Sequence, residues 1–168
     1  MNTIIRNESE SDIETISVIT KVAFESLAIS NHTEQFIICA LRNANALTIS
    51  LVAEAEKKVV GHIAFSPVAI SDGSPDWYGL GPISVLPELQ KQGIGKSLMR
   101  EGLSLLRSLG AKGCVLVGDL CYYERFGFIS RPNLLVEGVP PQYVLALPFE
   151  ESEAHGAVVF HEAFNAKG

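Results

Sequence analysis

Residues 78–119 carry the pattern that most restricts the fold, an apolar strand, a glycine-rich loop, a helix and a second apolar strand. The first strand is YGLGPISVL (78–86). The helix that follows has apolar residues at helical spacing, namely Ile94, Leu98, Leu105, Leu106 and Leu109. GCVLVGD (113–119) is a continuous apolar run, which is typical of a strand covered on both faces. This order predicts two parallel strands with a right-handed crossover.

The remaining segments predict one α/β domain with a mixed central sheet and flanking helices. Elements are expected at 3–6 (strand), 12–28 and 33–43 (helices), and 47–55, 59–70, 142–149 and 156–164 (strands). A length of 168 residues suffices for a single domain with its own core. We expect residues 1–150 to form the core of that domain and residues 151–168 to add a C-terminal extension containing a strand.

Composition excludes several classes of protein. A hydrophobic content of 47% favours a globular chain, and a net charge of −6 argues against a nucleic-acid surface. No apolar run reaches the ~20 residues that a membrane helix needs. The N-terminal MNTIIRNESESD becomes acidic where a signal peptide would become apolar. The three cysteines, Cys39, Cys114 and Cys121, are odd in number and not closely spaced. This favours free thiols in a reducing compartment over a disulfide framework. The sequence therefore predicts a cytoplasmic protein without nucleic-acid or membrane partners.

The loop ELQKQGIGKSL (88–98) has the composition of a phosphate-binding loop. It is not a Walker A loop, because the first glycine of that motif falls on Gln90. It is not a dinucleotide fingerprint either, because the third small residue falls on Leu98. What remains is Q-x-x-G-x-G between a strand and a helix start, where free N–H groups and the helix dipole attract anions. Lys91 and Lys96 add positive charge.

Two segments resemble one known family. GPISVLPELQKQGIGKSLM (81–99) resembles the acyl-CoA loop of the GNAT superfamily of N-acetyltransferases, which has the signature Q/R-x-x-G-x-G/A. YYERFGF (122–128) resembles the aromatic-Tyr-Glu-Lys-x-Gly-Phe segment of the same family, and it follows in the right order. Together with VGD (117–119), these segments are most similar to the bacterial YhbS-like branch. The resemblance implies a GNAT-like fold and acetyl-CoA as co-substrate, without a metal.

The resemblance also implies how coenzyme A is held. The amides from Lys91 to Ser97 would bind its pyrophosphate, with Gln90 shaping the loop. Irregular pairing between 78–86 and 113–119 would open a wedge for the pantetheine arm. The N–H of Val85 would polarise the thioester carbonyl. The cofactor-binding residues so implied are Ile83, Val85, Gln90, Lys91, Gln92, Gly93, Ile94, Gly95, Lys96 and Ser97.

The same alignment implies that Tyr123 is the catalytic acid. A tyrosine has a reference pKa of about 10 and a thiol about 8.5, so a tyrosine is protonated at neutral pH and able to donate to the leaving thiolate. A lone tyrosine is more often a packing residue, and that interpretation suits Tyr122 better than Tyr123.

The base that takes the proton of the acceptor amine is left open. His62 has a suitable reference pKa, but a lone histidine on a strand is more often structural. Asp119 and a water molecule are alternatives, while Glu25 and Glu34 could attract a cationic substrate. The four histidines are too far apart for an H-E-x-x-H metal site, and Cys114 and Cys121 do not form C-x-x-C.

The sequence thus predicts an acetyl-CoA-dependent N-acetyltransferase acting on a primary amine of a small molecule or a protein. The alternative is a non-catalytic acyl-CoA-binding or sensory module on the same fold, which would not need Tyr123. A homodimer formed through the sheet edge near the C-terminus would fit the family.

Overall fold

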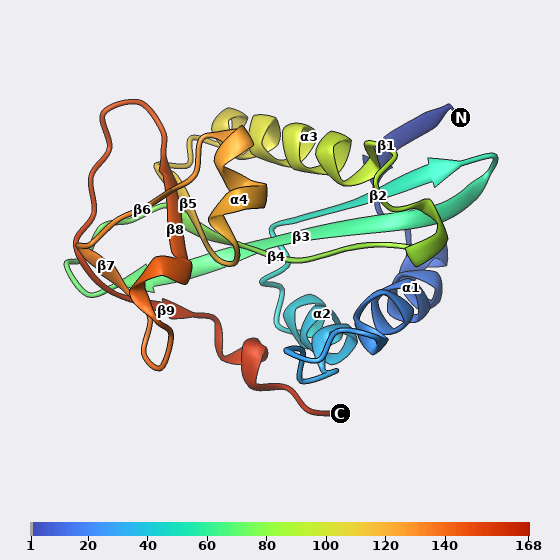
Figure 1. Cartoon of the computed structure of the whole chain (residues 1–168), viewed down its shortest axis with the longest axis horizontal. Helices are drawn as coiled ribbons and strands as arrows, with labels where there is room; N and C mark the ends of the chain where they lie inside the picture. The colour runs from blue at the N-terminus through green and yellow to red at the C-terminus, as the bar shows by residue number, and fades with distance from the viewer. Residues whose placement is uncertain (1) are drawn as a thin grey trace.

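A mixed sheet runs through the centre of the computed structural model, which describes residues 2–168 (Figure 1). Its strands follow the order β1-β2-β3-β4-β5-β8-β6, and β9 pairs with β3 and β7. The β4–β5 and β7–β9 pairs are parallel and the other pairs are antiparallel. The strands are β1 (Thr3–Asn7), β2 (Ile49–Ala55), β3 (Lys58–Ile70), β4 (Trp77–Val85), β5 (Gly113–Val117), β6 (Ile129–Ser130), β7 (Leu134–Leu135), β8 (Val144–Pro148) and β9 (Gly156–Phe160).

Helices cover both faces of the sheet. They are α1 (Ile13–Glu25), α2 (Glu34–Asn43), α3 (Ile94–Ser108) and the short α4 (Leu120–Tyr123). In Figure 1, α1 and α2 lie on one side of the strands and α3 on the other. Alternation along β2 explains this, because Leu51 joins the core cluster beneath α3 while Val52 packs with Ile16 and Ile38 of α1 and α2. The predicted mixed α/β architecture is confirmed.

Most expected elements are present within a few residues of their predicted bounds. The helix that begins at Ile94 ends at Ser108, and Gly110 follows with a φ of 85°, in the left-handed region that favours glycine. The strand expected at 113–119 is shorter and ends at Val117. It stops there because the carboxylate of Asp119 accepts a hydrogen bond from the N–H of Cys121 and so caps α4.

The expected strand at 156–164 is wrong in its second half. β9 ends at Phe160, and a 3₁₀ helix (Glu162–Asn165) follows, in which Nδ1 of His161 accepts a hydrogen bond from the N–H of Ala163. The apolar spacing that favoured a longer strand is instead used to bury Ala163 against α2, beside Ile37 and Leu41. The helix expected at 12–28 is also shorter, since α1 ends at Glu25.

The segment after residue 150 packs against the centre of the fold. β9 lies beside the end of β3, with Val68 opposite Phe160 and Ile70 opposite Val158. The 3₁₀ helix then crosses to α2 through Ala163. Phe160 and Phe164 of this segment are therefore half-buried, and each packs against a buried cluster of the domain.

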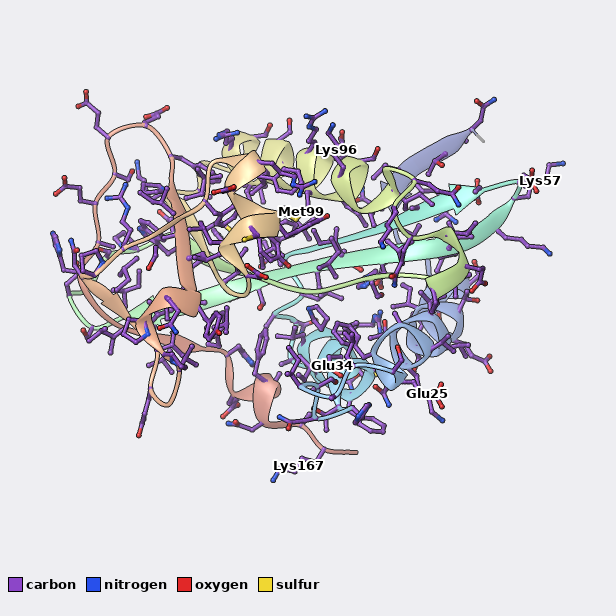
Figure 2. All side chains as sticks on the ribbon, in the orientation of Figure 1. Glu25, Glu34, Lys57, Lys96, Met99 and Lys167 are labelled. Carbon is purple, nitrogen blue, oxygen red and sulfur yellow. The ribbon has the colours of Figure 1, made fainter. Side chains whose placement is uncertain are left out.

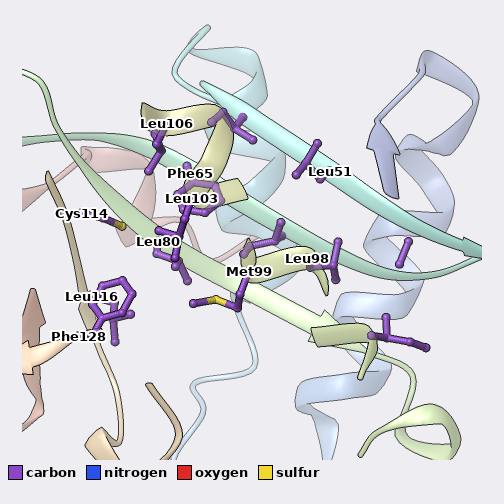
Figure 3. Packing of buried hydrophobic residues seen from close by; sticks show 14 of the residues in the cluster. Leu51, Phe65, Leu80, Leu98, Met99, Leu103, Leu106, Cys114, Leu116 and Phe128 are labelled. Atoms are coloured by element: carbon purple, nitrogen blue, oxygen red, sulfur yellow. The ribbon is translucent and has the colours of Figure 1, made fainter. Parts of the chain in front are cut away.

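Close packing of α3 on the sheet depends on a missing side chain. A Cβ at Gly102 would lie 2.6 Å from Cζ of Phe65, whose ring is fully buried in the core beneath α3 (Figure 3). Leu103 and Leu106 of the same helix surround this ring in the same cluster. Glycine at 102 is thus required by the approach of the helix to β3.

We expect Gly102→Ala to lower the free energy of unfolding by about 1–3 kcal/mol, because the added methyl group must displace the enclosed ring of Phe65. This loss outweighs the gain of roughly 1 kcal/mol in helix propensity from alanine. Denaturant unfolding provides the measurement, with the exposed Ser104→Ala on the same helix as a control. A Gly102→Ala protein as stable as the wild type would contradict this description of the core.

Candidate active site

The central sheet opens between β4 and β5. Parallel pairing joins Trp77–Gly79 to Gly113–Val115 only, so the two strands part beyond Gly79 and Val115. On its other edge, β4 has one residue more than β3 over the same length, since Ile63 pairs with Ile83 while Phe65 pairs with Leu80. The extra residue bends β4 away from β5. This confirms the irregular pairing that the sequence predicts for the two strands.

A cleft of about 650 Å³ lies where β4 runs into α3. Eight of the ten expected cofactor residues line it, and Gln92 and Ser97 do not. The hydroxyl of Ser97 instead donates a hydrogen bond to the carbonyl of Gly93. The lining residues are Ile83, Ser84, Val85, Leu89, Gln90, Lys91, Gly93, Ile94, Gly95, Lys96, Tyr122 and Arg125.

The loop before α3 has the geometry of an anion site. Gly93 adopts a φ of 88° immediately before the first helical residue, Ile94, and no side chain caps the first turn. The first N–H groups of a helix have no partner within it, so those of Ile94 to Lys96 are available to a ligand. Lys91 and Lys96 also line this cleft, and Figure 2 shows Lys96 on α3. The residues present therefore suit a diphosphate.

Gln90 joins this loop to the end of β4. Its Nε2 donates a hydrogen bond of 3.1 Å to the carbonyl oxygen of Val85, the last residue of the strand. A glutamine at the position of the first Walker glycine thus has a structural purpose, because it holds the strand end and the loop in one arrangement.

The two consecutive tyrosines face different cavities. Tyr122 lines the cleft beside α3, where the guanidinium of Arg125 lies 4.9 Å from the centre of its ring. Tyr123 lines a second cavity and packs edge-on against Phe128. The rings of Tyr122 and Tyr123 contact edge to face, with their planes at 89° and their centres 4.9 Å apart.

Tyr122 and Arg125 are functional candidates that the sequence interpretation missed. It favoured a packing role for Tyr122, whereas the structure brings this residue to the wall of the cleft. The spacing of Tyr122 and Arg125, three residues apart in a helical segment, is the signal that pairs them on one face. Burial raises the pKa of both tyrosines, that of Tyr123 to about 12 with a further contribution from Tyr122. Both are neutral at physiological pH.

The second cavity, of about 330 Å³, lies across the opening from the glycine loop and shares Ile83 with the first. Most of its lining is apolar or aromatic, and Glu34 is the carboxylate among the described lining residues. The expected alternative, Glu25, is not among them, and Figure 2 shows it at the end of α1. The lining comprises Phe24, Glu34, Ile37, Leu80, Gly81, Pro82, Ile83, Val117, Tyr123, Val136, Phe160 and Phe164.

Neither side chain considered as a base lines these two cavities. His62 is fully buried on β3, where its Nε2 lies 2.8 Å from the hydroxyl of Ser50, which in turn contacts Glu8. Burial lowers the pKa of His62 to about 4, so its ring is neutral at pH 7. Asp119 is exposed and caps α4.

The burial of His62 makes the stability of the fold depend on pH. Its pKa falls from an ordinary value of 6.5 to about 4. Below pH 6.5 the unfolded chain therefore takes up a proton that the folded protein does not. The contribution of His62 to the free energy of unfolding is therefore fully present above pH 6.5. We expect the free energy of unfolding to fall by about 3 kcal/mol as the pH falls to 4.

This dependence can be measured by denaturant unfolding at several pH values between 6.5 and 4. His62→Gln keeps a polar side chain beside Ser50. This variant is expected to remove most of the slope of the free energy of unfolding against pH. Equal slopes in the variant and the wild type would show that His62 is not the responsible group.

Two other kinds of feature are absent from residues 2–168. Over this range, no group of three or more His, Cys, Asp or Glu side chains is arranged to hold a metal ion. No helix in the described part of the chain combines the length and apolarity needed to cross a membrane.

A mixed sheet that parts between two parallel strands, next to a glycine-rich helix start, defines a domain with a cleft suited to a ligand that carries a diphosphate. Comparison with known proteins identifies the family. The model of the acetyltransferase (GNAT) domain matches residues 46–130. The chain belongs to the GNAT acetyltransferase family, whose enzymes use acetyl-CoA and an amine acceptor. The predicted family, enzyme class and co-substrate are confirmed.

Individual relatives agree with this assignment. A GNAT family acetyltransferase from Brucella melitensis, solved with acetyl-CoA, is 48% identical with a TM-score of 0.87, over 97% of this chain and 98% of its own. The structure of YhbS from Escherichia coli with CoA is 30% identical with a TM-score of 0.90, over 100% and 94%. By sequence, the uncharacterized N-acetyltransferase YhbS of Escherichia coli K12 is 36% identical over 126 residues, 74% of this chain and 72% of its own.

Proposed function

We propose that this acetyltransferase moves an acetyl group directly from acetyl-CoA to a primary amine of a small molecule or a protein, with Tyr123 acting on the leaving sulfur. The observation that carries the proposal is the junction of two cavities at the β4–β5 opening. One cavity is lined by the glycine loop and the other by Tyr123, and Ile83 belongs to both.

The residues of the first cavity would bind and orient the co-substrate. The N–H groups of Lys91 and of Gly93 to Lys96 would hold the pyrophosphate, helped by the charges of Lys91 and Lys96, whereas the N–H of Ser97 already donates to the carbonyl of Gly93. Bound acetyl-CoA supplies the thioester that an amine attacks. Val85, fixed through its carbonyl by Gln90, presents its N–H to the thioester oxygen, where negative charge develops.

Tyr123 would act chiefly as a hydrogen-bond donor. With its pKa raised to about 12, against about 8.5 for a thiol, complete proton transfer to a thiolate would cost about 5 kcal/mol. A donor held beside the sulfur still stabilises the charge that develops there. The proton lost by the attacking amine then balances the proton that the thiolate finally gains.

The attacking amine must first lose a proton, since an alkylamine has a reference pKa of about 10. His62 is buried and neutral, and Asp119 caps a helix, so we propose that this proton leaves through water rather than directly to either side chain.

Incubation with acetyl-CoA and a panel of amines, with detection of free thiol and of the acetylated amine by mass spectrometry, tests the proposal. We expect thiol release that depends on the amine and equals the amount of acetylated product. Binding of acetyl-CoA without amine-dependent release across the panel would overturn it and favour a non-catalytic acyl-CoA-binding module.

We further propose a cytoplasmic location, supported by three unpaired cysteines, Cys39, Cys114 and Cys121. Among the described residues, β6 covers the outer edge of β8 only at Leu145 and Ala146, so we propose that the rest of this C-terminal edge pairs with a second copy of the chain. Light scattering of the purified protein distinguishes a dimer from a monomer.

A further inference from the structure

We infer that the acceptor is a small primary amine carried on an apolar, otherwise uncharged body, and that Glu34, Phe160 and Phe164 select it. The inference rests on the proposed amine acetylation and concerns the second cavity. It also gives the C-terminal segment after residue 150 a function, since two of these three residues belong to it.

Glu34 provides one binding point for a cation. It is the first residue of α2 and is partly buried. The hydroxyl of Ser30 lies 2.8 Å from both of its carboxylate oxygens and fixes its position. A hydroxyl donates one proton, whereas a carboxylate accepts about four hydrogen bonds, so Glu34 keeps acceptors for an ammonium group. Since Tyr123 is neutral, Glu34 is the charged group among the described residues lining this cavity.

A single carboxylate limits the charge of the acceptor. A polyamine or an aminoglycoside would bring further ammonium groups into a cavity whose described lining offers no second acidic partner. Burying an unpaired charge against apolar walls is strongly unfavourable. The cavity therefore suits an amine with one positive charge before the proton is lost.

Aromatic rings form the apolar part of the cavity. The rings of Phe160 and Phe164 lie 5.2 Å apart, and Phe24 contributes a third ring from α1. Phe160 is held over β4, because a Cβ at Gly79 would lie 2.9 Å from its Cδ1. Phe164 follows Ala163, which is buried against α2. Fixed rings of this kind favour an apolar body, and an aromatic one in particular.

A lysine side chain of a protein also carries an amine on an apolar stem. The polar groups that line the cavity therefore decide between a small amine and a peptide. A bound peptide needs partners for its backbone amides. Apart from Glu34 and Tyr123, the described side chains lining the cavity are all apolar, and the volume of about 330 Å³ is that of a small-molecule site. A small amine fits this lining better than a peptide.

Kinetics with 2-phenylethylamine, hexylamine, spermidine and a lysine-containing peptide test the inference. We expect kcat/KM for 2-phenylethylamine and hexylamine to exceed that for spermidine and the peptide by at least roughly tenfold. A preference for spermidine or the peptide would overturn the inference and leave amine acetylation intact. Thiol release with none of these amines, despite bound acetyl-CoA, would overturn amine acetylation by this site and the inference with it.

Variants of Glu34 and Phe164 assign the preference to particular residues. Glu34→Gln is expected to raise KM for 2-phenylethylamine roughly 10- to 100-fold and to leave KM for acetyl-CoA unchanged. Glu25→Gln, on the exposed end of α1, is the matched control and should behave as the wild type. Phe164→Ala is expected to reduce the advantage of 2-phenylethylamine over spermidine, while Phe164→Leu retains most of it. An unchanged KM in Glu34→Gln, or an unchanged preference in a folded Phe164→Ala, would contradict the assignment.

Discussion

Replacing Tyr123 by phenylalanine is expected to lower kcat about 100- to 1,000-fold while leaving the affinity for acetyl-CoA nearly unchanged. The reason is its place in the site. Tyr123 lines the cavity opposite the glycine loop, so the variant loses a donor to the leaving sulfur but no contact with the loop. The ring itself stays, which preserves its packing against Phe128.

The control for this experiment is Tyr143→Phe. Tyr143 is 45% exposed and lines neither cavity, so the same loss of a hydroxyl should have little effect. Steady-state kinetics gives kcat, and calorimetric titration gives the dissociation constant of acetyl-CoA. Full turnover by Tyr123→Phe would remove this residue from the mechanism.

Gly95→Val is expected to weaken acetyl-CoA binding at least roughly 10- to 100-fold. A Cβ at this position would lie 3.1 Å from the hydroxyl of Tyr122 and 3.9 Å from Cγ2 of Val85. The two added methyl groups would therefore extend into the cleft at the first turn of α3, where the helix N–H groups face the ligand. Gly95 has an ordinary helical backbone, so the substitution itself does not strain the chain.

Calorimetric titration with acetyl-CoA measures this effect, and Gly95→Ala should show a smaller loss. Glu101→Ala, an exposed change on the same helix, is the control for altered helix stability. Wild-type affinity in a folded Gly95→Val protein would show that the ligand does not approach the start of α3.

The sequence was informative where local rules determine structure. An apolar strand, a glycine loop and an amphipathic helix predict the order and the approximate positions of these elements, because apolar spacing is a local property. The loop at 88–98 could be recognised as an anion site from the sequence, because the need for free N–H groups restricts which residues can occupy it. Gln90 in place of a glycine then excluded the nucleotide-triphosphate alternative.

The second cavity could not be predicted, because its lining comes from segments far apart in the chain. Phe164 reaches it only because β9 stops at Phe160 and a 3₁₀ helix crosses to α2, which depends on the burial of Ala163. Glu34 and Glu25 looked equivalent in the sequence, and only the packing of α1 against α2 separates them. The same is true of His62, whose burial excludes a catalytic interpretation that its side chain alone permits.

The central claim is direct transfer between two ligands bound together across the β4–β5 opening. Initial rates measured over a matrix of acetyl-CoA and 2-phenylethylamine concentrations test it most directly, with acetyl-CoA hydrolysis without amine subtracted. We predict intersecting double-reciprocal lines, and the same pattern in Cys121→Ser, which removes the exposed thiol on α4. Parallel lines together with an acetylated enzyme in mass spectrometry would contradict direct transfer and indicate a covalent intermediate.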